Sequence, residues 1–126
     1  MNVTIIGTGN VARGLSTRLV AGGNSVTLLA RNVEPAGELL ASLHQAAQGG
    51  ATARVAPLGS DIGGDVVVLA VPYAAVKEII AENRKHLAGK IVVDPTNPLN
   101  ATYDGLVTPA DSSAAEEIAR LLPDGT

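Results

Sequence analysis

The feature that most constrains this chain is its N-terminal stretch, in which an apolar run passes through a glycine loop into an amphipathic segment. Asn2–Ile6 is short and rich in β-branched residues, a composition typical of a buried strand. The loop Gly7-Thr8-Gly9-Asn10 follows directly, and Asn10–Ala21 then carries apolar residues at every fourth position. We expect a helix there, with a buried stripe formed by Val11, Leu15 and Leu19.

The same alternation of strand-like and helical segments continues to the end of the chain. Further strands are expected at Ser25–Ala30, Thr52–Ala56, Asp65–Val71 and Lys90–Asp94. Further helices are expected at about Val33–Gln48, Ala74–His86 and Ser113–Leu122. Apolar strands that alternate with helices indicate a parallel sheet with right-handed crossovers. We predict an α/β protein, a single domain over residues 1–126, with a doubly wound sheet of about five strands in the order 3-2-1-4-5 and no sixth strand.

The expected helices have specific burial and capping patterns. The second should bury Ala36, Leu39, Leu40, Leu43 and Ala47. The third should bury Val76, Ile79, Ile80, Asn83 and Leu87. The last begins with Ser113-Ala-Ala-Glu116, which fits a capping box in which the hydroxyl and the carboxylate each accept from a backbone N–H at the helix start.

Composition excludes several classes of protein. Hydrophobic residues make up 46% of the chain and charged residues 17%, which is typical of a globular protein and not of a disordered one. Tyr73 and Tyr103 are the only aromatic residues and the net charge is −3, so we expect no nucleic-acid partner. The chain has no cysteine, no apolar run of transmembrane length and no basic leader, so we expect a cytoplasmic protein with no membrane partner.

The glycine loop has the spacing of a dinucleotide-binding fingerprint. Residues 7–12 form a GxGxxA pattern between a strand and a helix, as in Rossmann-type sheets. In this pattern Gly7 permits a tight turn, and Gly9 lets the backbone approach a pyrophosphate. Ala12 and Gly14 should let the helix pack closely on the strand, and the helix start favours a bound anion. The alternative is a purely structural turn.

The end of the second strand discriminates between the two nicotinamide dinucleotides. NAD sites place an acid about 20 residues after the glycine loop, where it binds the ribose 2′-hydroxyl. Here that place is taken by Arg31 and Asn32, and the first acid is Glu34. A guanidinium offers planar donors to a 2′-phosphate, whereas a carboxylate would repel it. Arg31 therefore favours NADP(H), the alternative being a solvated loop charge.

Two further loops follow strands at the carboxyl edge, where open α/β sheets bind ligands. Val71-Pro72-Tyr73 should lie against the ribose and nicotinamide, unless Pro72 only starts a helix. The loop from Asp94 to Pro98 brings the Thr96 hydroxyl and the Asn97 amide to the same crevice, unless it is only a rigid turn.

The titratable side chains suggest no protein-based catalyst. His44 and His86 fall in or near helices, away from the strand ends, and are interpreted as non-catalytic. No nucleophile triad and no metal-ligand set is apparent, a pattern that fits chemistry carried by bound cofactors.

The chain resembles the NADPH-dependent reductases of coenzyme F-420 (F420) in the segments IIGTGNVARGL, LLARN, VVVLAVPYAAV, VVDPTNPLN and YDGLVTPADSSAAEEIARLLP. The similarity runs in register through essentially the whole chain, and the last two segments are far more specific than GxGxxA. The resemblance implies an oxidoreductase that transfers a hydride directly between NADP(H) and the deazaflavin F420. It also implies that no acid or base from the protein is obligatory.

The resemblance further implies roles for individual residues. The pyrophosphate would be held after the Gly7 turn by Thr8, Gly9, Asn10 and Val11. The 2′-phosphate would be held by Arg31 and Asn32. The nicotinamide side would be lined by Ala70, Val71 and Pro72, next to Tyr73. Thr96 and Asn97 would lie near the deazaflavin or the nicotinamide. Family members continue into a sixth strand and a helical C-terminal region that helps enclose the second cofactor and builds the dimer, and this sequence carries only the dinucleotide-binding part.

Two other functions stay open on the sequence. One is a non-catalytic NADP(H)-binding module that senses the cofactor or completes its site with a partner chain. The other is an NADP-dependent reductase of a different small substrate. We also expect the edge of the fifth strand to be unpaired, or covered by a second copy or a partner chain, because exposed apolar edges invite pairing.

Overall fold

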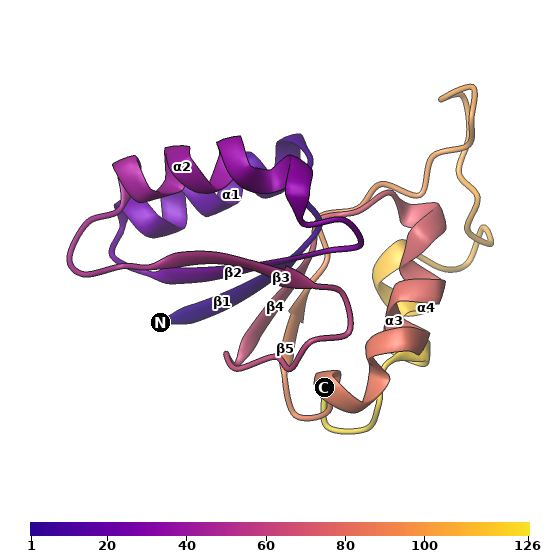
Figure 1. Cartoon of the computed structure of the whole chain (residues 1–126). Coiled ribbons are helices and arrows are strands. Elements are labelled where there is room, and N and C mark those ends of the chain that lie inside the picture. Colours follow the sequence, from indigo (N-terminus) through magenta and orange to yellow (C-terminus); the bar gives the residue numbers. More distant parts are fainter.

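The computed structural model describes all 126 residues and shows one parallel sheet with helices on both faces (Figure 1). The strands are β1 (Asn2–Ile6), β2 (Ser25–Ala30), β3 (Ala53–Pro57), β4 (Val66–Leu69) and β5 (Ile91–Val93). The helices are α1 (Asn10–Ala21), α2 (Gly37–Ala46), α3 (Tyr73–Leu87) and α4 (Ala114–Leu121), with a 3-10 turn η1 (Glu34–Ala36) before α2. Neighbouring strands pair in parallel in the order β3-β2-β1-β4-β5, which confirms the predicted Rossmann-type sheet.

Each face of the sheet has its own hydrophobic core. The helices α1 and α2 cover one face, and α3 and α4 cover the other (Figure 1). Leu28 of β2 packs in the first core with Leu43 of α2, whereas its neighbour Leu29 packs in the second core with Ile80 of α3. This division follows from the alternation of side chains along a strand. Because both faces are covered, the central strands β1, β2 and β4 are mostly apolar, and Thr4 of β1 is itself buried.

The buried face of α1 differs from the predicted stripe. Val11 and Leu15, which were expected to be buried, are 50% and 38% exposed. The residues of α1 that are buried are Ala12, Ser16 and Val20. Ser16 can lie against the sheet because its hydroxyl donates to the Ala12 carbonyl at 2.6 Å, so no polar group is left unpaired. A polar residue satisfied within its own helix escapes a search for apolar periodicity.

The expectation for Gly14 was also wrong, whereas that for Ala12 is confirmed. Ala12 is fully buried beside the glycine loop. Gly14 is exposed, and a Cβ built on it would meet nothing within 4 Å. The close approach of α1 to the sheet therefore depends on Ala12 and not on Gly14.

The second helix is shorter than predicted. The expected segment Val33–Gln48 begins with the 3-10 turn η1 around Pro35, and α-helical geometry starts only at Gly37. A proline near the first position of a helical turn costs no hydrogen bond, so the chain enters through η1. Of the predicted face, the buried residues are Ala36, Leu39 and Leu43, and the partly buried ones are Leu40 and Ala47.

The predicted features of the last two helices are confirmed for α3 and half confirmed for α4. The buried residues of α3 are the five expected ones, Val76, Ile79, Ile80, Asn83 and Leu87. At α4 the Ser113 hydroxyl accepts from the Glu116 N–H at 3.2 Å, as a capping box requires. The Glu116 carboxylate, however, accepts from the Ser113 hydroxyl at 3.0 Å and not from a backbone N–H.

The third to fifth strands end close to the predicted positions, and β5 forms an edge of the sheet. β3 runs one residue further than expected, to Pro57, which an edge strand tolerates at its end. β4 and β5 are shorter than the predicted runs. β5 pairs only with β4, and its Ile91 and Val93 are 63% and 43% exposed because α1 and α2 do not cover this end of the sheet.

No helix has the length and apolar character needed to cross a membrane.

Candidate functional site

Gly7 joins the ends of three neighbouring strands. It follows β1, and its N–H donates to the Leu29 carbonyl of β2 at 2.9 Å. Its φ is +119°, and a Cβ on it would lie 2.1 Å from the Ala70 carbonyl oxygen beyond β4. Only glycine permits this backbone angle and this contact together. The structure thus brings the glycine loop against Ala70 and Val71, two residues that the sequence assigned to the same site.

The start of α1 has the features of an anion-binding site. Gly9 is the N-cap residue, no side chain accepts from the N–H groups of the first turn, and that turn contains no acid. A Cβ on Gly9 would meet nothing within 4 Å, so the backbone is approachable there. Thr8 is half-buried, and Asn10 and Val11 are exposed. Free N–H groups and the positive end of the helix dipole together favour a phosphate.

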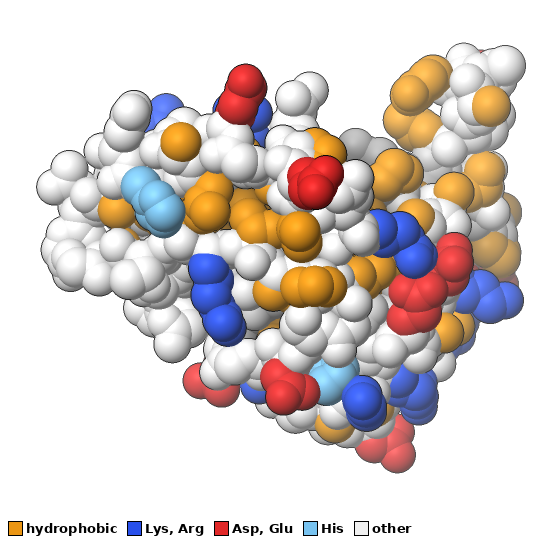
Figure 2. All heavy atoms as spheres, viewed as in Figure 1, with side chains coloured by type: hydrophobic (Ala, Val, Ile, Leu, Met, Phe, Trp, Pro, Cys, Tyr) orange, Lys and Arg blue, Asp and Glu red, His pale blue; other side chains and the backbone are white.

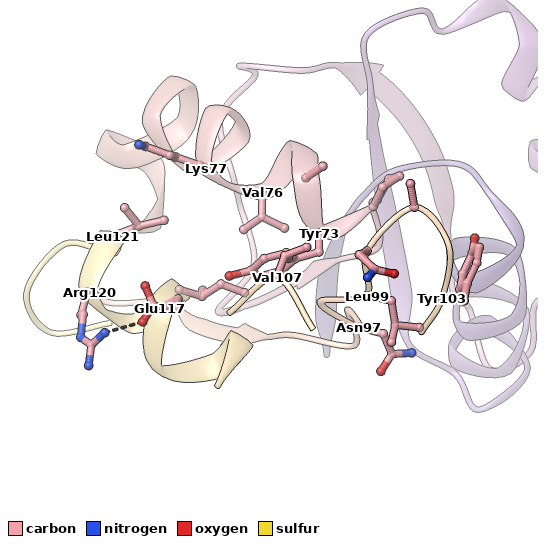
Figure 3. Close-up of a pocket in the computed structure, with 15 residues that line it drawn as sticks. Tyr73, Val76, Lys77, Asn97, Leu99, Tyr103, Val107, Glu117, Arg120 and Leu121 are labelled. Atoms are coloured by element: carbon pink, nitrogen blue, oxygen red, sulfur yellow. Dashed lines mark hydrogen bonds and ion pairs between the residues drawn. The ribbon is translucent and has the colours of Figure 1, made fainter. Parts of the chain in front are cut away.

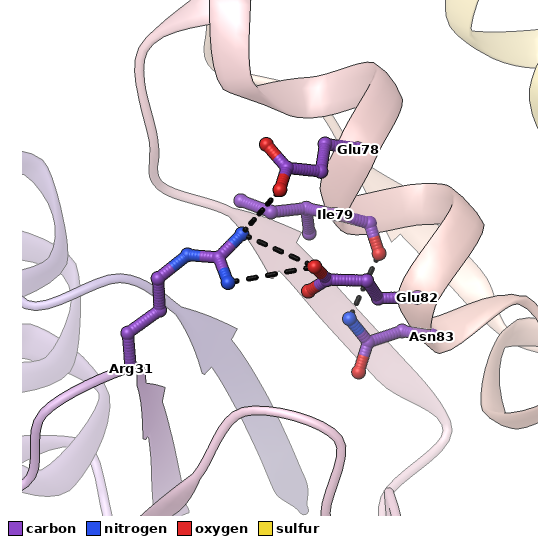
Figure 4. Close-up of polar contacts among 5 residues, drawn as sticks. All are labelled: Arg31, Glu78, Ile79, Glu82 and Asn83. Atoms are coloured by element: carbon purple, nitrogen blue, oxygen red, sulfur yellow. Dashed lines mark hydrogen bonds and ion pairs between the residues drawn. The ribbon is translucent and has the colours of Figure 1, made fainter.

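Arg31, at the end of β2, contacts two acids that the sequence did not associate with it. Its Nη2 lies 3.4 Å from an oxygen of Glu78 and 3.4 Å from an oxygen of Glu82, both on α3 (Figure 4). Its Nη1 also lies 3.4 Å from Glu82. The neighbouring Asn32 accepts from the Glu34 N–H at 3.3 Å, a contact within the loop itself. The guanidinium that was expected to meet a 2′-phosphate is therefore engaged within the chain.

The loops after β4 and β5 have local structural roles as well as exposed groups. Pro72 is the N-cap residue of α3, so it does start a helix. The Asp94 carboxylate accepts from both the backbone N–H and the hydroxyl of Thr96, at 2.9 Å and 2.6 Å. The Thr96 hydroxyl has thereby used its proton and can only accept from a ligand. Asn97 is exposed.

The segment after Asn97 folds into a hairpin that projects from the sheet (Figure 1). Leu99 and Leu106 form an antiparallel bridge within it. At its tip the Thr102 hydroxyl and the Asn100 amide donate to the Asp104 carboxylate at 2.6 Å and 2.8 Å. These hydrogen bonds, with that of Thr102 the larger influence, hold the pKa of Asp104 below its ordinary value. Hydrophobic side chains lie on the surface of this projection (Figure 2).

A pocket of about 960 Å³ lies between α3, the hairpin and α4 (Figure 3). Three residues that the sequence assigned to the site contribute to its lining: Pro72, Tyr73 and Asn97. Its apolar lining comes from all three elements and includes Val76, Leu99, Val107, Ile118 and Leu121. Neither the glycine loop nor Arg31 lines it. The sequence analysis did not predict that the hairpin and α4 line this pocket. For α4, the apolar residues Ile118 and Leu121 could have indicated a buried or ligand-facing side.

Both histidines lie at helix ends. His44 is in the last turn of α2, with Nε2 2.9 Å from the Ala53 carbonyl oxygen. His86 is in the last turn of α3, with Nδ1 3.2 Å from the Asp61 carboxylate. Neither histidine lines the pocket beside α3 and α4.

A family model described as NADP oxidoreductase, coenzyme F420-dependent, matches residues 2–98. That span contains all five strands and every residue that the sequence assigned to the site, from Gly7 to Asn97. The chain belongs to this F420-dependent oxidoreductase family. The resemblance stated from the sequence is thereby confirmed. Most of the hairpin and all of α4 lie beyond the matched residues.

Two of the similar proteins carry F420-dependent names, and a third shares the fold. The chain is 29% identical over 129 aligned residues to the F420-dependent NADP reductase of Methanothermobacter thermautotrophicus, an alignment that covers 97% of this chain and 56% of that protein. A protein of Arthrobacter sp. FB24, provisionally assigned as an F420-dependent NADP-reductase, has a similar crystal structure, with a TM-score of 0.80 and 25% identity over 95% of this chain and 57% of its own. A hypothetical protein of Sinorhizobium meliloti has the same fold, with a TM-score of 0.81 and 22% identity over 99% of this chain and 58% of its own. The chain thus spans just over half the length of each of these three proteins.

Proposed function

We propose that this chain binds NADP(H) along the carboxyl edge of its sheet and takes part in hydride exchange between NADP(H) and F420. The observation that carries the proposal is the open start of α1 behind Gly9, which has no side-chain cap and no acid in its first turn. Such a helix start fits a pyrophosphate. Membership of the F420-dependent family supports F420 as the second substrate.

The cofactor contacts follow from the positions of the loops. The pyrophosphate would lie on the backbone from Gly7 to Val11, at the helix start. Arg31 and Asn32 would meet the 2′-phosphate at the end of β2. Ala70, Val71, Pro72 and Tyr73 would line the nicotinamide side, because Ala70 and Val71 already contact the glycine loop. Thr96 and Asn97 would lie near the reacting rings.

The chemistry belongs to the two cofactors, and the protein positions them. Bound together, the two cofactors would supply the chemistry, a hydride passing from the nicotinamide to the deazaflavin with a proton taken up from solvent. The residues of this chain have the task of holding the dinucleotide in one orientation, since transfer needs the two rings face to face. Thr96 would contribute an acceptor, because its proton is held by Asp94.

The test is to mix the purified chain with NADPH and F420 and follow the deazaflavin absorbance. Loss of that absorbance, and its return with NADP and reduced F420, are the expected results. Failure to bind NADPH in a fluorescence titration would overturn the proposal as a whole. Binding of NADPH without any hydride transfer would reject the catalytic part.

A second candidate is an NADP(H)-binding unit that a second copy or a partner chain completes. The observation that favours it is the edge strand β5, where Ile91 and Val93 are 63% and 43% exposed. An unpaired apolar edge of this kind is a pairing surface. We propose a homodimer or a partner chain that covers β5, and hydride transfer that depends on the concentration of the chain would support it.

A further inference from the structure

Arg31 lies in a cluster of charges that the proposed cofactor site does not explain. The guanidinium extends from the end of β2 to α3, where Glu78 and Glu82 stand one turn apart on the same helix face (Figure 4). Both terminal nitrogens of Arg31 are engaged, Nη2 with the two carboxylates and Nη1 with Glu82. These nitrogens form the planar fork with which arginine binds a phosphate.

The three contacts between Arg31 and the two glutamates are long, so a ligand can replace them. Each measures 3.4 Å, whereas charge-assisted hydrogen bonds between such groups are commonly about 2.8 Å. The side chain of Arg31 is 58% exposed, and those of Glu78 and Glu82 are 68% and 40% exposed. Acidic and basic side chains lie together at this surface over α3 (Figure 2). Ion pairs exposed to water to this degree are weak.

The cluster is unbalanced in charge. Two carboxylates face one guanidinium, and carboxylates one helical turn apart repel each other. A 2′-phosphate that binds Arg31 would have to displace both carboxylates from the guanidinium and would then remain close to both of them. A 2′-hydroxyl carries no charge and meets no such opposition.

We propose that Glu78 and Glu82 determine cofactor choice by competing with the 2′-phosphate of NADP(H) for Arg31. The two acids act through Arg31 and lower the preference of the site for NADP(H) over NAD(H). This inference rests on the proposed function, in which Arg31 meets the 2′-phosphate. The inference gives α3 a part in distinguishing the two dinucleotides. This helix belongs neither to the glycine loop nor to the end of β2.

The experiment removes the charges and keeps the shapes. The variants are Glu78→Gln, Glu82→Gln and the double variant, with Asp65→Asn as a matched control. Asp65 is an exposed acid just before β4, at the edge of the sheet opposite the glycine loop. Affinities for NADPH and NADH are measured by fluorescence titration, and those for adenosine 2′,5′-bisphosphate and 5′-AMP by calorimetry, which isolates the contribution of the 2′-phosphate. Thermal unfolding of each variant checks that it folds.

The expected result is a selective gain in affinity. The double variant should bind NADPH and the bisphosphate about three- to tenfold more tightly, and NADH and 5′-AMP within about twofold of wild type. Each single variant should shift in the same direction by less, and Asp65→Asn should shift nothing. The ratio of NADPH to NADH affinity is the decisive quantity, because a merely structural role of the acids would change both alike.

Two other outcomes separate the inference from the proposed function. If the double variant binds NADPH as wild type does or more weakly, while Arg31→Ala weakens NADPH alone, the competition is rejected and the 2′-phosphate assignment stands. A weaker double variant would mean that the acids hold Arg31 ready for the phosphate. If wild type binds neither dinucleotide, the proposed function fails and the inference fails with it.

Discussion

The Cα of Gly7 faces the Ala70 carbonyl so closely that a Cβ would come within 2.1 Å of its oxygen. This contact sets the distance between the glycine loop and the end of β4. It makes Gly7 a structural requirement of the fold, whereas the open backbone position is that of Gly9.

Gly7→Ala should therefore destabilise the fold. A positive φ costs a residue with a Cβ about 1–2 kcal/mol, and forcing a methyl group into a packed site costs about 1–3 kcal/mol more. We expect a loss of about 2–5 kcal/mol in the free energy of unfolding, measured by urea denaturation. Gly14→Ala is the matched control, because its Cβ would meet nothing within 4 Å on an exposed helix face. That variant should gain about 0.5–1 kcal/mol. Equal stability of the two variants would contradict the contact.

Arg31→Ala should weaken NADPH binding and leave NADH binding nearly unchanged. A charge-assisted hydrogen bond contributes about 1.5–3 kcal/mol, and this is the expected loss for NADPH in a fluorescence titration. Arg18→Ala, an exposed arginine in the last turn of α1, is the control and should change neither affinity. Equal losses for both dinucleotides would rule out a contact with the 2′-phosphate.

Asn83 should be replaceable by an apolar residue with a gain in stability. It is fully buried in α3, its Nδ2 donates to the Ile79 carbonyl at 2.8 Å, and its Oδ1 has no partner. An unsatisfied buried polar atom costs about 1–3 kcal/mol, so Asn83→Leu should raise the free energy of unfolding by about 1 kcal/mol. Asn83→Asp should lower it by more than about 2 kcal/mol, because a charge would then be buried. A destabilised leucine variant would show that Oδ1 has a role that the apolar core cannot replace.

Low pH should loosen the tip of the projecting hairpin. The pKa of Asp104 is lowered in the folded chain because Thr102 and Asn100 donate to its carboxylate. A group with a lowered folded pKa stabilises the fold above its unfolded pKa, and this contribution is lost as the pH falls through the folded pKa. An NMR titration of the Asp104 carboxyl carbon should show the low midpoint. Thr102→Val should raise that midpoint, whereas Thr102→Ser, which keeps the hydroxyl, should leave it low.

A lysine on the β5 edge should reduce self-association of the chain. Ile91 is 63% exposed on an edge strand that pairs only with β4. We expect wild type to associate with rising concentration in sedimentation experiments, and Ile91→Lys to shift it toward the monomer, since edge lysines oppose strand pairing. Leu106→Lys, which changes an exposed leucine of the hairpin, is the control for loss of apolar surface alone. Wild type that stays monomeric throughout would contradict a homodimer built on this edge.

The sheet could be predicted because its signals are local. Runs such as Asn2–Ile6 and Ser25–Ala30 are short, mostly apolar and rich in β-branched residues, and the structure has them at the predicted bounds. The stripe of α3 is likewise the predicted one. The stripe of α1 was not, because tight packing beside the glycine loop selects Ala12 and Ser16 by their small size. Periodicity of large apolar residues cannot detect that selection.

The sequence by itself determined the alternation of strands and helices, the glycine loop and the presence of Arg31 at the end of β2, because each depends on residues that are neighbours in the chain. The strand order followed from the type of sheet that this alternation predicts. Only the tertiary structure decided what these groups touch. It placed Ala70 against Gly7 and brought Glu82, 51 positions away, to Arg31. Such contacts arise when crossover helices pack across parallel strands, and no local pattern records which side chains then meet.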